Sequence, residues 1–277
     1  MADIVAVAGV PHTPGFPALA RTDTAAGAEL ARRYAAVEEV VARADADVLV
    51  ILTCDHINTF TPDMWPTFAI ATGDGVRGPN DDVPGVSPTS YALDGDIGTT
   101  LHRGLVAQDF DPVALRGHSV DHSVVVPLHF LNTRRLPVVP VYLNGMVAPR
   151  PSAERCRRLG RVLRNALEDL PGRRIAVVAS GSFSLEVGGP RMLPGRLYGV
   201  PRPSWAGTVA DRLYRGDLDG LVAETTERRI EEAGTVAGEV LPWIAAAEMA
   251  ADLSVAHMDH REGEGHAFAA WGTGRNG

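Results

Sequence analysis

The sequence predicts an α/β fold in which helices flank one central, largely parallel or mixed sheet. The first observation is a set of short, almost continuously apolar runs, which are typical of strands buried on both faces. They stand at 4–10, 47–54, 137–143 and 174–180. The second observation is a set of segments with apolar residues at helical spacing. These lie at 23–45, 151–169, 204–215 and 239–250. Alternating strands and helices indicate a layered α/β domain, and without a repeat or low-complexity linker, residues 1–277 are predicted to form a single one.

Two long segments carry little regular pattern. Residues 72–97 are rich in Gly, Pro, Asp and Ser, and residues 181–203 are rich in Gly and Pro. Long loops inside a compact domain are usually functional or disordered, and both of these follow strand-like runs. We therefore expect them to frame a pocket at the strand ends, where α/β folds bind ligands.

Composition excludes several classes of function. The chain has 277 residues, 45% hydrophobic and 22% charged, with a net charge of −8. An acidic balance argues against binding to nucleic acids or anionic membranes, which need a basic face. No apolar stretch approaches the roughly 20 residues of a membrane span, and the N-terminus has no cationic segment of a signal peptide. The two cysteines, Cys54 and Cys156, do not suggest a disulfide scaffold, so we expect a cytoplasmic protein.

Two histidines follow two of the apolar runs. His12 stands two residues past the first run, and His56 stands shortly after the second. The pattern predicts that both emerge at the same edge of the sheet from adjacent parallel strands, about 4.8 Å apart. Such side chains can share one metal ion. Asp55 is expected either to orient an imidazole or to cap the following turn.

A glutamate far downstream supplies a third donor. Glu239 follows the small residues Gly234, Ala237 and Gly238, which let backbone approach a site closely, and Trp243 is expected to bury its helix. Two imidazoles and one carboxylate leave about three faces of an octahedral Fe(II) open, which suits an oxygenase. The same donors also suit catalytic zinc, so a zinc-dependent hydrolase or lyase stays open.

Two more histidines are candidates for acid–base chemistry. His122 precedes an apolar run, and His266 leads into another, so each can face the interior. An imidazole titrates near neutral pH, which suits proton transfer. His118 and His129 are expected to be structural. The glycine-rich stretch 73–78 has dinucleotide-loop spacing, but Pro79 and the acidic residues after it cannot open the required helix.

Five segments in this order resemble the class III extradiol ring-cleavage dioxygenases, the superfamily of the protocatechuate 4,5-dioxygenase β subunit. They are 10–14, 54–56, 121–128, 179–184 and 232–243. The resemblance implies an Fe(II) ion held by His12, His56 and Glu239. It also implies that His122 acts near the substrate and that Ser182 and Ser184 contact the substrate. The implied activity inserts both atoms of O2 and cleaves a catechol-type ring, of the catechol, gallate, protocatechuate or 2-aminophenol kind.

This chain departs from the family pattern at the acid–base position, and the family's Asp-His-Gly is also changed, to Asp121-His122-Ser123. The family motif Ser-Gly-Gly-Leu-Ser-His ends in an acid–base histidine, whereas this chain reads Ser180-Gly181-Ser182-Phe183-Ser184-Leu185. Leucine cannot move a proton, so we expect that His122 or His266 takes over this step, that the substrate differs from a catechol, or that turnover is poor. A catalytically silent partner subunit is the alternative, although such a subunit has no physical need for three retained ligand positions. We expect either a homo-oligomer or a hetero-oligomer with a small second subunit.

Overall fold

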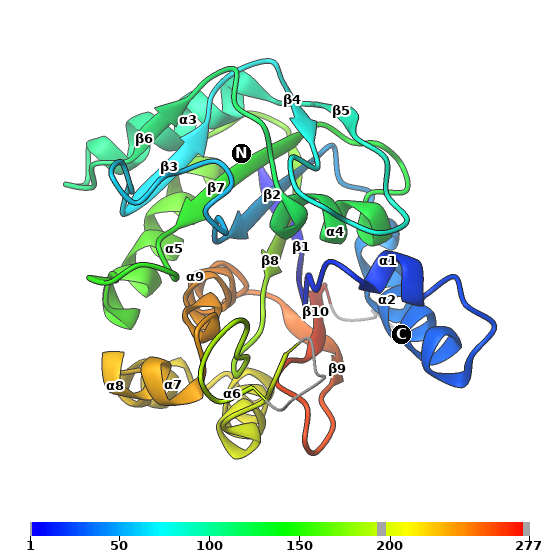
Figure 1. Cartoon of the computed structure of the whole chain (residues 1–277). Coiled ribbons are helices and arrows are strands. Elements are labelled where there is room, and N and C mark those ends of the chain that lie inside the picture. The colour runs from blue at the N-terminus through cyan, green and yellow to red at the C-terminus, as the bar shows by residue number, and fades with distance from the viewer. Residues whose placement is uncertain (1, 193–197, 274–277) are drawn as a thin grey trace.

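An eight-stranded mixed sheet forms the centre of the computed structural model, which describes residues 2–192 and 198–273 (Figure 1). The strand order is β6-β3-β7-β2-β8-β1-β10-β9. The strands of this sheet are β1 (Asp3–Val10), β2 (Val48–Thr53), β3 (Phe68–Ala71), β6 (Val113–Leu115), β7 (Val138–Leu143), β8 (Arg174–Ser180), β9 (Ser254–Asp259) and β10 (Phe268–Gly272). The inner strands β7, β2, β8 and β1 run parallel. The predicted fold class is thus confirmed.

Helices cover both faces of the sheet (Figure 1). They are α1 (Phe16–Leu19), α2 (Ala25–Arg43), α3 (Gly95–Val106), α4 (His122–Leu131), α5 (Ala153–Glu168), α6 (Pro203–Arg215), α7 (Leu218–Glu224), α8 (Glu227–Ala233) and α9 (Val240–Met249), with a 3-10 turn η1 at Ala237–Glu239. Successive β2 side chains alternate between two apolar layers: Leu52 packs in the layer that contains α3, α5 and α9, and Ile51 in the layer that contains α2 and α4. This alternation is why the central strands are apolar throughout. Within the described ranges, no helix is long and apolar enough to span a membrane.

Two expectations about the chain path need correction. Residues 72–97 are not wholly irregular, because β4 (Gly75–Gly78) and β5 (Thr89–Ala92) form a separate antiparallel hairpin there. The strands that precede His12 and His56 are not neighbours either, because β8 lies between β1 and β2 and pairs with both. The apolar runs alone do not reveal strand order. The segment 181–203 was predicted to be irregular. Its described residues before α6, 181–192 and 198–202, contain no helix or strand, and 193–197 lie outside the described residues.

Candidate metal centre and active site

The ends of β1, β2 and β8 bring together side chains that are distant in the sequence. His12 Nε2 lies 3.1 Å from Glu239 Oε1, and His56 Nε2 lies 2.8 Å from the same oxygen. His12 and Glu239 are buried. The structure therefore brings the three predicted ligands to one point.

Backbone packing fixes Glu239 at this point. It is the last residue of η1 and precedes α9, whose Trp243 is buried as predicted. A Cβ at Gly238 would lie only 1.9 Å from the carbonyl oxygen of Gly145, so glycine is needed next to the glutamate. The Ser182 amide donates to Glu239 Oε2 at 2.6 Å. One carboxylate oxygen is thus held by the loop after β8, while the other faces the two imidazoles.

The hydrogen bonds of His12 indicate where its proton lies. The Ser180 hydroxyl donates to the Ser123 carbonyl at 2.8 Å, so it accepts from His12 Nδ1 at 2.6 Å. Burial lowers the pKa of His12 more than Glu239 raises it, which favours the neutral ring. A neutral His12 with its proton on Nδ1 turns the lone pair of Nε2 towards the Glu239 carboxylate. Two lone pairs that face each other repel, and a cation between them would remove this repulsion.

His56 lies between two carboxylates. Its amide donates to Asp121 Oδ2 at 3.0 Å, and its Nδ1 lies 3.5 Å from that oxygen, within ion-pair range but without hydrogen-bond geometry. Burial opposes the charged ring, but Asp121 and Glu239 outweigh it and raise the pKa of His56 to about 10. Burial likewise opposes ionisation of Glu239, yet the charged His56 ring, 2.8 Å away, holds the pKa of Glu239 well below the usual range. The pocket therefore favours positive charge.

These donors fit a divalent metal ion. Donor atoms about 2.1 Å from one ion and at right angles to each other lie about 3 Å apart. The spacings of 3.1 and 2.8 Å between the Nε2 atoms and Glu239 Oε1 match that value. Because metal ligands bind deprotonated, a metal here would take the place of the proton shared by His56 and Glu239.

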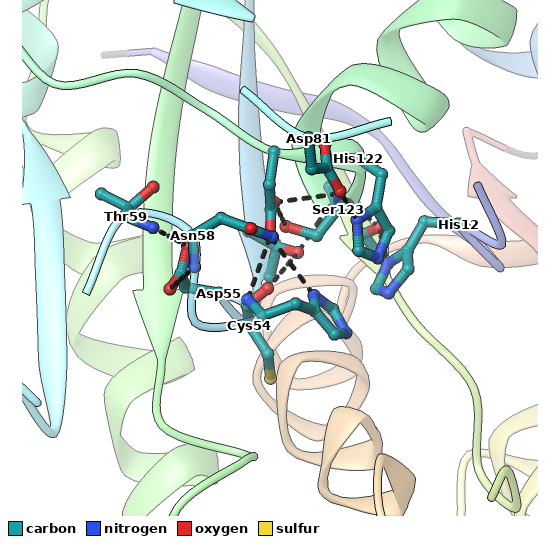
Figure 2. A network of polar contacts seen from close by, with 12 residues as sticks. His12, Cys54, Asp55, Asn58, Thr59, Asp81, His122 and Ser123 are labelled. Carbon is teal, nitrogen blue, oxygen red and sulfur yellow. Dashed lines mark hydrogen bonds and ion pairs between the residues drawn. The ribbon is translucent and has the colours of Figure 1, made fainter. Parts of the chain in front are cut away.

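His122 completes a cluster of three imidazoles. Its ring centroid lies 4.4 Å from that of His56 and 5.3 Å from that of His12. One ligand atom from each of the three rings lies within 4.8 Å of the others. His122 opens α4, and its Nδ1 contacts Asp81 Oδ2 (Figure 2).

The other predicted site residues lie around this cluster in different ways. His266 is buried next to Phe16 and Phe268, with ring centroids 5.9 and 5.7 Å away, and is not part of the imidazole cluster. The Ser184 hydroxyl donates to the Ala233 carbonyl and accepts from the Arg202 amide. Ser182 is buried and reaches Glu239 through its amide. The roles predicted for these three residues stay predictions.

Three residues behind the imidazoles were not predicted from the sequence. Asp121 contacts His56, Ser180 contacts His12, and Asp81 contacts His122. Asp121 had a local signal, because it directly precedes His122 and its side chain caps α4 through the Ser123 amide at 3.0 Å. Of the two roles predicted for Asp55, the structure shows the cap: its carboxylate accepts from the amides of 58–60.

Comparison with known proteins gives a consistent result. Residues 6–269 match the family described as the catalytic LigB subunit of aromatic ring-opening dioxygenase. A 2,3-dihydroxyphenylpropionate/2,3-dihydroxicinnamic acid 1,2-dioxygenase of Paraburkholderia xenovorans (strain LB400) is 29% identical over 258 residues, or 79% of this chain and 80% of that protein. The enzyme numbered 1 under the same name in Dechloromonas aromatica (strain RCB) is 26% identical over 290 residues, or 90% and 89% of the two chains.

A solved structure supports the fold. The uncharacterized protein JW3007 from Escherichia coli K12 superposes with a TM-score of 0.61 over 98% of this chain and 100% of its own, at 12% identity. The family match covers nearly the whole sequence and includes every residue of the imidazole and carboxylate cluster. The chain belongs to the family of the catalytic LigB subunit of aromatic ring-opening dioxygenases, the class of enzyme that its sequence predicted.

Proposed function

We propose that this chain is an Fe(II)-dependent extradiol dioxygenase that cleaves the ring of a catechol-type substrate with both atoms of O2. The observation that carries the proposal is the convergence of two imidazole Nε2 atoms on one oxygen of Glu239. In this proposal His12, His56 and Glu239 hold the iron. Bound Fe(II) would supply open faces for the substrate and dioxygen and would lower the pKa of a coordinated hydroxyl.

The chain's own residues then handle the substrate proton. Position 185, where the family has its acid–base histidine, is a leucine, and His266 lies outside the imidazole cluster. His122 lies inside it. We therefore assign to His122 both the uptake of a substrate hydroxyl proton and its later return. Ser182 and Ser184 stay the proposed polar contacts to the substrate, and the Ser184 hydroxyl also bonds to the Ala233 carbonyl and the Arg202 amide.

The substrate is proposed to be a 3-substituted catechol. The relatives from P. xenovorans and D. aromatica are named for 2,3-dihydroxyphenylpropionate and 2,3-dihydroxicinnamic acid. At 26–29% identity, this chain can accept substrates whose ring substituents differ from those of the relatives' substrates. The first panel should hold catechol, 2,3-dihydroxyphenylpropionate, protocatechuate, gallate and 2-aminophenol.

Anaerobic loading with Fe(II), followed by oxygen-uptake measurement against this panel, tests the proposal. We expect uptake of one O2 per ring opened, with a yellow ring-opened product. His12→Ala and Glu239→Ala should lose iron, whereas His122→Ala should keep iron and lose rate. Iron-loaded protein that consumes no oxygen with any of these compounds would favour the silent-subunit alternative. Hydrolysis or lyase activity that appears with Zn(II) alone would favour the zinc alternative.

The location of the enzyme in the cell and its oligomeric state are also proposals. We place the enzyme in the cytoplasm, as a homo-oligomer or with a small second subunit. Light scattering of the purified chain, alone and after co-purification from its native host, measures the assembly.

A further inference from the structure

Both carboxylate oxygens of Asp81 contact His122. Asp81 Oδ1 accepts from the backbone amide of His122 at 3.0 Å, and Asp81 Oδ2 contacts the ring nitrogen Nδ1 of the same residue. One oxygen of Asp81 therefore binds the backbone of His122, and the other binds its ring. Figure 2 shows Asp81 next to the His122 ring, with His12 farther along.

The loop that carries Asp81 is tied by hydrogen bonds to the segment before α4. Two backbone hydrogen bonds join the residues just before Asp81 to Val120. The Val120 amide donates to the Arg77 carbonyl at 3.0 Å, and the Asn80 amide donates to the Val120 carbonyl at 2.9 Å. The Asn80 side chain donates to Ser119 Oγ at 2.8 Å. Gly78 packs so closely that a Cβ there would lie 2.5 Å from the Val120 carbonyl oxygen. The loop that carries Asp81 is thus bound directly to the segment that leads into His122.

Asp81 lies at the N-terminus of α4, where free backbone amides and the helix dipole favour an anion. A carboxylate can only accept hydrogen bonds, so its contact with Nδ1 requires a proton on Nδ1. In that tautomer of the imidazole, the lone pair is on Nε2.

We propose that Asp81 is a positioning residue that fixes the tautomer and orientation of His122 for proton transfer, an inference that rests on the function proposed above. With Nδ1–H on Asp81, Nε2 accepts a proton from a substrate hydroxyl oxygen. The ring becomes an imidazolium, and the Asp81 carboxylate stabilises its charge. The proton later leaves from Nε2 and the ring returns to its starting tautomer. This arrangement lets one imidazole act as base and then as acid, in a chain whose position 185 holds leucine.

Asp81→Asn tests the proposal in the iron-loaded enzyme. An amide that turns its NH2 group to Nδ1 favours the opposite tautomer, so kcat should fall about 10–100-fold, a part of the 10²–10⁴ that general acid–base catalysis supplies. KM should change by less than about twofold and iron affinity should stay the same. Asp82→Asn is the matched control, because it makes the same charge change on an exposed neighbour, and it should retain wild-type kcat.

Two further readouts separate positioning from a merely structural role. Adding Asp81→Asn to His122→Gln should cause no further loss of kcat, because both changes remove the same proton transfer. In the Zn(II)-loaded chain, which is diamagnetic, the ¹⁵N shifts of the His122 ring should report protonated Nδ1 in wild type and a different tautomer balance in Asp81→Asn. The NMR readout does not depend on turnover, so it tests Asp81 even if the proposed reaction is wrong.

Three outcomes would overturn the inference. The first is wild-type kcat in Asp81→Asn, and the second is unchanged His122 ¹⁵N shifts in that variant. The third is a loss of metal affinity in Asp81→Asn, which would make His122 a metal ligand and Asp81 the residue that orients it. If Asp81→Asn unfolds, Asp81→Ser keeps a small acceptor for the His122 amide, and the same criteria apply to it.

Discussion

The burial of His266 predicts a specific loss of stability in acid. Its ring packs next to Phe16 and Phe268 and is 8% exposed. Desolvation in this apolar surrounding lowers its pKa to about 4, against the attraction of Glu264. An unfolded histidine titrates near 6.5. Between pH 6.5 and pH 4, the unfolded chain therefore holds a proton that the folded chain does not.

The stabilisation is complete above pH 6.5 and is lost as the pH falls towards 4. For pKa values of 6.5 and about 4, the linkage relation gives a loss of about 2 kcal/mol between pH 7.5 and pH 5.0. His266→Leu removes this titration, so its free energy of unfolding should fall by about 2 kcal/mol less over the same interval. Other titrating groups contribute to both proteins and cancel in the difference.

Urea unfolding at the two pH values, in EDTA so that metal binding does not contribute, measures this difference. Phe16→Leu is the matched control, because it disturbs the same packing but keeps the imidazole, and it should retain most of the wild-type pH dependence. Equal pH dependence in wild type and His266→Leu would show that His266 is not a buried neutral ring. The same variant also tests His266 as a catalyst: if it takes part in proton transfer, kcat at pH 7.5 should collapse.

Three further predictions concern the metal centre and the core. Ser180→Ala removes the acceptor for His12 Nδ1 and should weaken Fe(II) binding about 10–100-fold in a chelator competition. Gly181→Ala should lower both metal affinity and stability, the latter by about 1–3 kcal/mol in urea unfolding, because φ is +147° and the new Cβ would lie 2.4 Å from Glu239 Cβ. Leu101→Ala on α3, fully buried on the face opposite α2 and α4, should cost about 2–5 kcal/mol of stability, with kcat retained at 25 °C.

The central strands could be predicted because burial on both faces leaves a continuous apolar record. All four predicted runs are strands, with ends within about a residue of the prediction. The outer strands left weaker signals: β6 has only three residues, and β9 has only exposed and partly buried positions. The β4–β5 hairpin lies in a Gly- and Pro-rich stretch whose composition is that of a loop. Strand order depends on how the crossovers pack, so the insertion of β8 between β1 and β2 left no local signal.

The candidate ligands could be proposed because each stands at a recognisable boundary. His12 and His56 follow apolar runs, and Glu239 precedes an apolar helix behind small residues. Their partners could not be found in the same way. Ser180 is 168 residues from His12, and Asp81 is 41 residues from His122. An aspartate in a polar loop resembles any solvated aspartate until the fold places an imidazole next to it.

The partners behind the imidazoles also divide the chemistry between the rings. His12 is backed by a hydroxyl whose single proton points away, which favours a neutral ring and a free Nε2. His122 is backed by a carboxylate, which stabilises a ring that gains a proton. The carboxylates of Glu239 and Asp121 both lie within ion-pair range of His56, so they favour a cation among these donors. Asp81 contacts His122 through both of its carboxylate oxygens. The site therefore divides into a donor set of His12, His56 and Glu239, which suits a metal ion, and a separate pair of Asp81 and His122, which suits proton transfer.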